Sequence, residues 1–261
     1  MILNQIAADT IIRVEKAKQK VSLSEIREKA VKMNANTGFP FEQTLKKPGI
    51  HYICEVKKAS PSKGVIAEEF PYLDIAREYE KAGAAAISCL TEPKYFQGKN
   101  EYLQEIAGEV RIPVLRKDFT VDEYMIYEAK LLGASAVLLI CALLDAETLK
   151  RYLDICDTLG LSALVEVHDE VEMESAMEAG ARVIGVNNRN LKDFTVDIGN
   201  SIRLRNMAPR EVLFVAESGI KTVEDIEELR RANVNGVLIG ETLMRSADKR
   251  RMLEELNGGA L

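Results

Sequence analysis

The segment KLLGASAVLLI, residues 130–140, decides the fold because it joins a helix end, a glycine and an apolar strand without interruption. The glycine suits the left-handed residue that commonly ends a helix. The apolar run after it lacks the alternation of a half-exposed strand and is typical of a strand covered on both faces. The same unit recurs as EKAGAAAISCL (80–90), DTLGLSALVEV (157–167) and MEAGARVIGV (177–186). This repetition indicates parallel strands joined by helical crossovers.

Eight such strands are predicted along the chain. They start near Tyr52, Ala84, Pro113, Ala134, Leu161, Ala181, Glu211 and Gly236. Between them, apolar residues recur at helical spacing, as at Tyr72, Ile75 and Tyr79. Eight β–α units in one run predict an α/β fold, a (β/α)8 TIM barrel that forms one domain over residues 1–261. A doubly wound open sheet is the alternative, but no glycine-rich dinucleotide turn follows the first strand.

An extension of residues 1–48 precedes the first strand. It is predicted to begin with a helix from about Leu3 to Lys20, followed by a second helix that starts at a capping box of Ser22 and Glu25. We expect this helical extension to act as a lid. Two positions remain open for it: on the N-terminal face or side of the barrel, or over the mouth of the active site.

Composition restricts the classes of function. The chain of 261 residues is 47% hydrophobic, enough for a large core, and its net charge of −6 argues against a nucleic-acid partner. Apolar runs such as 136–144 are too short to cross a bilayer, and the N-terminus lacks the features of a signal peptide. We therefore expect a cytoplasmic protein without a membrane partner, either a monomer or at most a weak dimer.

Cysteine and histidine are sparse and scattered. The four cysteines have no CxxC spacing, which indicates free buried thiols in a reducing compartment rather than a zinc site. His51 and His168 are the two histidines, so no metal site is expected. No nicotinamide or flavin motif is present, and no cofactor is expected.

Polar residues gather at the C-terminal ends of the predicted strands. They are Glu55, Lys57, Lys117, Glu166, Asn187, Arg189, Glu217 and Ser218, and the last two strands also end with the glycines Gly219 and Gly240. In a barrel these ends line the catalytic mouth, and residues two apart, such as Glu55 and Lys57, share one side of a strand. Burying several charges together is costly unless they pair or hold a ligand. The pattern therefore predicts an active site at this end.

The last two strands indicate the kind of ligand. The segments ESGIKTVEDI (217–226) and IGETLM (239–244) each place a glycine shortly before a helix, where free backbone N–H groups favour an anion. The loops after strands 7 and 8 of such barrels are a frequent phosphate site. Ser60, Ser62 and Lys57 offer further donors, so a phosphorylated small molecule is the expected substrate.

Lys117 and Glu166 form a candidate acid–base pair. A lysine surrounded by carboxylates stays protonated and can donate to a carbonyl oxygen, whereas a glutamate in an apolar wall can accept a proton near neutral pH. A Schiff base at Lys117 is the alternative, which the surrounding glutamates disfavour.

Three neighbouring side chains have other expected roles. Asp118 faces away from Lys117 and is expected to be a structural partner of a helix. His168 lies in the turn VHDE, where we expect it to cap the next helix. Arg189 is expected either to contact the ligand or to form a salt bridge with Glu217.

Seven segments together resemble one family, the indole-3-glycerol phosphate synthases. They are EVKKASPSKG (55–64), LTEPKYFQG (90–98), PVLRKDF (113–119), LVEVHDE (164–170), IGVNNRNL (184–191), VAESGI (215–220) and LIGETLM (238–244). They occur in order, about one per β–α unit, and the N-terminal extension also fits the family. The ordered set is far more specific than any single motif.

The resemblance implies a reaction and a set of residue roles. The substrate would be 1-(2-carboxyphenylamino)-1-deoxyribulose 5-phosphate, closed to indole-3-glycerol phosphate with loss of CO2 and water. Lys117 would be the general acid of ring closure. Glu166, with Lys57, would serve the dehydration. Glu55 and Asn187 would orient the anilino-carboxylate part.

The remaining implied residues bind substrate. They are Ser60, Arg189, Glu217, Ser218, Gly219, Gly240 and Glu241. Some relatives have serine in place of Glu241, and a glutamate side chain there should point away from phosphate and leave only its backbone N–H to bind.

Two other functions remain open on the sequence. A phosphoribosylanthranilate isomerase shares the phosphate site, but such isomerases are shorter, lack the extension and need no lysine at strand 3. A non-catalytic sugar-phosphate sensor should have lost the acid or the base. The presence of both Lys117 and Glu166 disfavours the sensor.

Overall fold

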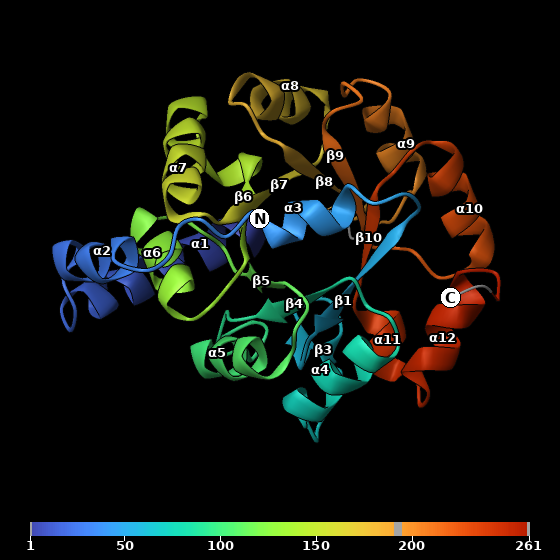
Figure 1. The fold of residues 1–261 in the computed structure, drawn as a ribbon, viewed down its shortest axis with the longest axis horizontal. Coiled ribbons are helices and arrows are strands. Elements are labelled where there is room, and N and C mark those ends of the chain that lie inside the picture. The colour runs from blue at the N-terminus through green and yellow to red at the C-terminus, as the bar shows by residue number, and fades with distance from the viewer. Residues whose placement is uncertain (1, 191–194, 260–261) are drawn as a thin grey trace.

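Eight parallel strands close into a barrel in the order β1-β10-β9-β8-β7-β6-β5-β4, and β4 pairs back onto β1 (Figure 1). The computed structural model describes residues 2–190 and 195–259. The strands are β1 His51–Val56, β4 Ala86–Leu90, β5 Val114–Lys117, β6 Ala136–Ile140, β7 Ser162–Val167, β8 Val183–Asn187, β9 Leu213–Glu217 and β10 Gly236–Ile239. The predicted (β/α)8 barrel is confirmed, and every strand begins within about two residues of its predicted start. Met1, Leu191 of the IGVNNRNL segment and residues 260–261 lie outside the described residues.

Helices surround the barrel and connect its strands (Figure 1). They are α4 Tyr72–Lys81, α5 Asn100–Glu109, α6 Glu123–Leu131, α7 Ala146–Leu159, α8 Glu170–Glu178, α9 Gly199–Arg205, α10 Val223–Arg231, α11 Glu241–Arg245 and α12 Lys249–Leu256, with a short 3-10 turn η1 at Cys141–Leu143. A small hairpin, β2 Ala59–Ser60 with β3 Gly64–Val65, follows β1. Gly160 caps α7 in the left-handed conformation at φ 66°, as its place in the repeated unit predicts.

Alternation along each strand divides the apolar residues into two cores. In β1, Ile53 belongs to the cluster inside the barrel, whereas Cys54 and Val56 pack outward against the helices. In β7, Leu164 points inward and Val165 packs outward. The inward side of β1, β5, β7, β8 and β9 is apolar first and polar at its C-terminal end, so these polar groups collect at one mouth.

The N-terminal extension contains three helices, α1 Ile2–Lys18, α2 Leu23–Val31 and α3 Pro40–Leu45. In Figure 1, α3 lies across the end of the barrel that faces the viewer, and α1 lies farther back. Phe41 and Leu45 of α3 join the inner apolar cluster, so α3 covers the N-terminal end of the strands. Ile2 and Ile6 of α1 line the cavity at the other end. Different helices therefore occupy the two positions that the sequence left open.

Local signals for the extension are present in its sequence. The Ser22 side chain accepts a hydrogen bond from the Glu25 backbone N–H and so caps α2, which is one half of the predicted capping box. The Glu25 carboxylate pairs with Lys29 instead of completing the box, and α1 ends at Lys18 rather than near Lys20. Within residues 2–190 and 195–259, no helix combines the length and apolar character needed to cross a membrane. The four cysteines are buried and unpaired, namely Cys54, Cys89, Cys141 and Cys156.

Candidate active site

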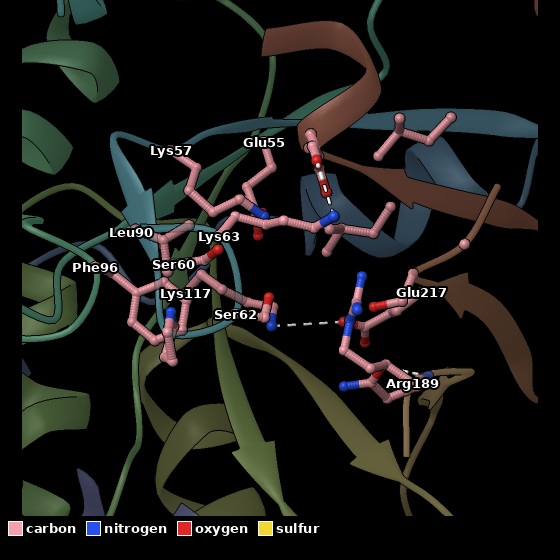
Figure 2. Close-up of a pocket in the computed structure, with 18 of the residues that line it drawn as sticks. Glu55, Lys57, Ser60, Ser62, Lys63, Leu90, Phe96, Lys117, Arg189 and Glu217 are labelled. Atoms are coloured by element: carbon pink, nitrogen blue, oxygen red, sulfur yellow. Dashed lines mark hydrogen bonds and ion pairs between the residues drawn. The ribbon is translucent and has the colours of Figure 1, made fainter. Parts of the chain in front are cut away.

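A cavity of about 560 Å³ opens at the C-terminal ends of the strands (Figure 2). Every residue that the sequence singled out for catalysis or substrate binding lines it: Glu55, Lys57, Ser60, Lys117, Glu166, Asn187, Arg189, Glu217, Ser218, Gly219, Gly240 and Glu241. They come from both halves of the chain, because the barrel closes through β1 and β10. The structure therefore brings together the complete predicted set.

Lys117 lies among buried carboxylates. Its Nζ is 3.4 Å from Glu166 Oε2 and 3.5 Å from Glu217 Oε2. The two glutamate side chains are 4% and 3% exposed, and that of Lys117 is 16% exposed. Asn187 Nδ2 donates to Glu166 Oε1 at 3.2 Å and fixes the far side of that carboxylate. Because the alternate strands β5, β7 and β9 deliver Lys117, Glu166 and Glu217 to one layer of the barrel, a single ammonium is shared by two carboxylates.

Burial and charge shift the pKa values of this cluster in different directions. Burial alone would lower the pKa of Lys117, but the glutamates around it, Glu217 first, raise that pKa and keep the ammonium protonated. Burial would raise the pKa of Glu166, but Lys117 and His168 outweigh burial and lower the pKa to about 2. For Glu217, burial prevails over the opposing effect of Lys117, and Glu166 adds to burial, so its pKa rises to about 7.

These shifts differ from the sequence prediction in one respect. Glu166 was expected to accept a proton near neutral pH because it ends an apolar strand. Instead, Glu166 lies between the cations Lys117 and His168, which stabilise its ionised form. The carboxyl group with a pKa near neutral is Glu217, which shares Lys117 with Glu166.

Lys57 and Glu55 form a second pair in the cavity. Lys57 Nζ donates to Glu55 Oε1 at 2.5 Å, with both side chains largely buried. A Cβ at Gly240 would lie 2.5 Å from Glu55 Oε1 and 2.8 Å from Lys57 Nζ. A Cβ at Gly185 would collide with Glu217 Oε1. Both glycines therefore leave the space that the charged side chains occupy.

The loops after β9 and β10 form the expected phosphate end of the cavity. Ser218 and Gly219 have φ of 67° and 85°, and Gly240 precedes α11. The Glu241 carboxylate accepts from Arg245 Nε at 3.1 Å and lies 3.6 Å from Lys63 Nζ, an ion pair drawn as a dashed line in Figure 2. Burial would raise the pKa of Glu241, but Arg245 and Lys63 lower it, so its negative charge is held by these two cations.

An apolar wall is the part of the cavity that the sequence prediction missed. Phe96 and Phe119 lie with ring centroids 5.9 Å apart, and Leu138 and Ile140 of β6 complete this wall. Phe96 and Phe119 lie within the LTEPKYFQG and PVLRKDF segments, so a signal for them was present. Charged residues at strand ends stand out in a sequence, whereas apolar cavity residues look like core.

The prediction that His168 caps a helix is wrong. The cap of α8 is Asp169, whose side chain accepts from the Glu172 backbone N–H. The His168 ring instead lies between two glutamates, with Nε2 3.3 Å from Glu166 Oε1 and Nδ1 3.0 Å from Glu172 Oε2. The prediction failed because the side chain of the residue after the strand continues toward Glu166 rather than back to the helix.

Asp118 is a structural partner of a helix, as predicted. Its Oδ1 accepts from Arg13 of α1 at 2.7 Å, and its Oδ2 accepts from Thr91 Oγ1 at 2.5 Å. Lys18 of α1 reaches Asp122 at 2.7 Å. These contacts fasten α1 to the loops after β4 and β5, and its first turn contributes Ile2, Leu3 and Ile6 to the cavity.

No group of His, Cys, Asp and Glu in the described part of the chain is arranged to hold a metal ion. The chemistry that the cavity offers can be read from its ammonium and carboxylate groups. These comprise a shared proton donor at Lys117, carboxylates in different charge environments, and glycine loops suited to an anion.

Comparison with known proteins gives consistent results along the whole chain. Residues 3–256 match the family described as indole-3-glycerol phosphate synthase. Proteins of that name are 59% identical in Ruminiclostridium cellulolyticum, over 100% of both chains, and 54% identical in Endomicrobium trichonymphae, over 98% of this chain and 99% of the relative. Among solved structures, a 3-hexulose-6-phosphate synthase superposes with a TM-score of 0.65 at 15% identity, covering 81% of this chain and 100% of that chain. That structural likeness concerns the barrel fold alone.

Proposed function

The chain belongs to the indole-3-glycerol phosphate synthase family, and on that premise we propose how the residues of its cavity share the reaction. The enzyme is a carboxy-lyase of tryptophan biosynthesis. It closes the ring of 1-(2-carboxyphenylamino)-1-deoxyribulose 5-phosphate and releases CO2 and water to form indole-3-glycerol phosphate. The residue roles proposed here combine what the resemblance to the family implies with the geometry of the cavity.

The substrate phosphate binds at the loops after β9 and β10. Gly219 and Gly240 bring backbone close to the cavity, Glu241 supplies the first backbone N–H of α11, and Ser60 supplies a hydroxyl. The Glu241 side chain is held by its cation partners, so its backbone alone serves the phosphate. Ser218 shares the β9 loop with Gly219 and belongs to this subsite.

The aromatic ring of the substrate packs on the apolar wall of Phe96, Phe119, Leu138 and Ile140. Glu55, Asn187 and Arg189 border the same space and orient the anilino-carboxylate part. This placement puts the substrate ketone between the ring and the phosphate, next to Lys117.

Ring closure begins with Lys117. Its ammonium donates a proton to the ketone oxygen, and the ring carbon that carries the carboxylate attacks the ketone carbon. Loss of CO2 returns the electron pair to the ring. The raised pKa of Lys117 keeps it protonated beforehand and disfavours a Schiff base, which needs the neutral amine. Glu217 holds the ammonium in place.

Dehydration needs one proton donor and one acceptor. Lys57 protonates the leaving hydroxyl, and Glu166 accepts a proton from the methylene carbon next to the nitrogen. The proton then passes from Glu166 to Lys117, 3.4 Å away. Lys57 regains its proton from solvent, so one proton is taken up per turnover, which balances the carboxylate that leaves as CO2.

The N-terminal extension belongs to the same functional unit. We propose that the chain acts as one domain in which residues 1–48 form a lid, with Ile2, Leu3 and Ile6 over the bound substrate. The polar contacts of Arg13 and Lys18 support this position of α1. Four unpaired buried thiols suit a reducing compartment, and we propose the cytoplasm as the place of action and a monomer as the working form.

One observation carries these roles: a single ammonium, Lys117, is shared by buried carboxylates in a cavity that also carries two glycine loops. The test is incubation of the purified protein with the carboxyphenylamino-deoxyribulose phosphate, followed by indole fluorescence. We expect indole-3-glycerol phosphate to form without added metal or cofactor. Absence of product at saturating enzyme would overturn the assignment.

A further inference from the structure

A chain of three titratable side chains ends at Glu166 on the wall of the cavity. Glu172 Oε2 lies 3.0 Å from His168 Nδ1, and His168 Nε2 lies 3.3 Å from Glu166 Oε1. The second contact is an ion pair by distance, and its angles are not those of a hydrogen bond. Exposure of the side chains falls along this chain, from 20% for Glu172 to 17% for His168 and 4% for Glu166. Glu166 lines the cavity, whereas His168 and Glu172 are not among its lining residues. A substrate that fills the cavity therefore leaves the contact between His168 and Glu166 in place.

The position of His168 is fixed from several directions. Its backbone N–H donates to Glu172 Oε2 at 2.8 Å, so one carboxylate oxygen holds both the ring and the main chain. Asn200 Nδ2 of α9 donates to the His168 carbonyl at 3.1 Å. Asp169 caps α8 and keeps Glu172 in the first turn of that helix. The ring is thus held with its Nε2 toward Glu166.

His168 carries a positive charge in this environment. Burial would lower its pKa, but Glu166 and Glu172 outweigh burial and raise the pKa to about 10. Cys141 of η1, which packs against α8, is a neutral thiol because burial, with nearby Glu172, raises its pKa to about 12. Asp169 is engaged in its cap. The imidazolium is therefore the cation that faces Glu166 on this side.

The imidazolium of His168 matters at the point of the catalytic cycle at which Lys117 has lost its proton. At rest, Glu166 has Lys117 at Oε2 and His168 at Oε1. When Lys117 has given its proton to the ketone, it is neutral and no longer favours the ionised form of Glu166. A carboxylate this deeply buried then tends to take up a proton. A protonated Glu166 has no free site for the methylene proton, so dehydration would stop.

We propose that His168, held by Glu172, keeps Glu166 ionised and oriented during the interval in which Lys117 is neutral. The proposal rests on the roles assigned above to Lys117 and Glu166. His168 and Glu172 touch no substrate atom and act through Glu166, so they are positioning residues of the dehydration. Lys117 serves ring closure, and His168 serves the step that follows it.

The test separates the two chemical steps in the full chain. In a single turnover of His168→Gln, release of CO2 from carboxyl-labelled substrate reports ring closure, and indole fluorescence reports dehydration. Glutamine keeps a hydrogen-bonding side chain of similar length but no charge. We expect CO2 release at nearly the wild-type rate and indole formation roughly 10- to 100-fold slower near pH 6.5. By pH 9 the lag between CO2 release and indole formation should shrink, because solvent then removes the extra proton from Glu166.

A matched control changes the neighbouring residue. Asp169→Asn keeps an amide that caps α8 and leaves the contacts of His168 intact, so its two rates should remain equal to those of the wild type. Equal slowing of both steps in His168→Gln, a lag independent of pH, or no lag would overturn the proposal. Failure of the wild-type protein to release CO2 would instead overturn the proposed function, so the two failures are distinguishable.

Discussion

The two ends of the barrel both bury charge, but they balance it differently. At the N-terminal end, Glu42 of α3 accepts from Ser162 Oγ at 3.1 Å and from two nitrogens of Arg182 at 2.9 and 3.0 Å. At the C-terminal end, Lys117 is shared between Glu166 and Glu217. Glu217 Oε1 is buried without a hydrogen-bond partner among the described residues. One end has a satisfied pair, whereas at the other two carboxylates share one lysine and one carboxylate oxygen lacks a hydrogen-bond partner among the described residues.

This difference separates structural charge from functional charge. A buried carboxylate with a bidentate guanidinium and a hydroxyl has its needs met by the fold, so it fixes α3 on the strands. A cluster with an unsatisfied oxygen and shared cations is costly in the free protein and gains partners when ligand binds. The comparison predicts that substitutions at the N-terminal end of the barrel change stability alone. Substitutions at the C-terminal end should change activity first.

Lys117→Met should have the largest effect. It removes the proton donor of ring closure while keeping the length of the side chain, and kcat should fall roughly 10²- to 10⁴-fold. Substrate should still bind, because the phosphate loops and the apolar wall are untouched. Steady-state kinetics by indole fluorescence and binding by calorimetry measure the two quantities. Near-normal turnover in this variant would show that the acid is a different residue.

Arg182→Met tests the opposite end. It leaves Glu42 buried with Ser162 as its remaining partner, which should cost about 2 kcal/mol of unfolding free energy, reduced from the full value for a buried pair because Arg182 is 44% exposed. The value of kcat should stay unchanged. Urea unfolding together with kinetics checks both. A drop in kcat at temperatures where the variant is fully folded would contradict the separation of the two ends.

Glu217→Gln should change how stability depends on pH. Burial and Glu166 raise the pKa of the folded Glu217 to about 7 from an ordinary 4.5, so between these values the folded chain holds a proton that the unfolded chain has released. Wild-type stability therefore falls as pH rises through this window. Glutamine cannot titrate, so the unfolding free energy of the variant relative to that of the wild type should rise between pH 5 and pH 8, by on the order of 1–2 kcal/mol. Urea unfolding at both pH values measures it, and an identical difference at pH 5 and pH 8 would refute the shift.

Much of the fold and the site followed from local patterns. The glycine before each apolar run, as at Gly133 and Gly160, reports a left-handed helix end, and that feature is encoded within a few residues. Glu55 and Lys117 could be placed at the mouth because strand parity needs no tertiary information. These predictions concern which way a side chain points.

The properties of the site that the sequence did not predict depend on how the strands and helices are arranged around the barrel. The pKa values of Glu166 and Glu217 depend on their burial and on their distances to Lys117 on another strand, and strand parity carries neither quantity. The bridging role of His168 likewise needs the position of α8 relative to β7. The apolar wall was missed for another reason: Phe119 at a mouth and a phenylalanine in a core have the same local sequence signal.

Glu241→Gln should have the smallest effect and sharpens the comparison at the phosphate end. The Glu241 carboxylate is partly exposed and engages Lys63 at 3.6 Å and Arg245 at 3.1 Å, so it is neither the satisfied pair of one end nor the shared cluster of the other. Removing its charge should free both cations and tighten competition by inorganic phosphate a few-fold, since a half-exposed pair contributes about 1 kcal/mol or less. Inhibition constants at low and high salt measure this, and the gain should shrink at high salt because exposed charges are screened. Glu101→Gln on the outer helix α5 is the matched control and should leave phosphate inhibition unchanged, whereas weaker inhibition in Glu241→Gln would mean that the carboxylate organises the phosphate loop rather than opposing the anion.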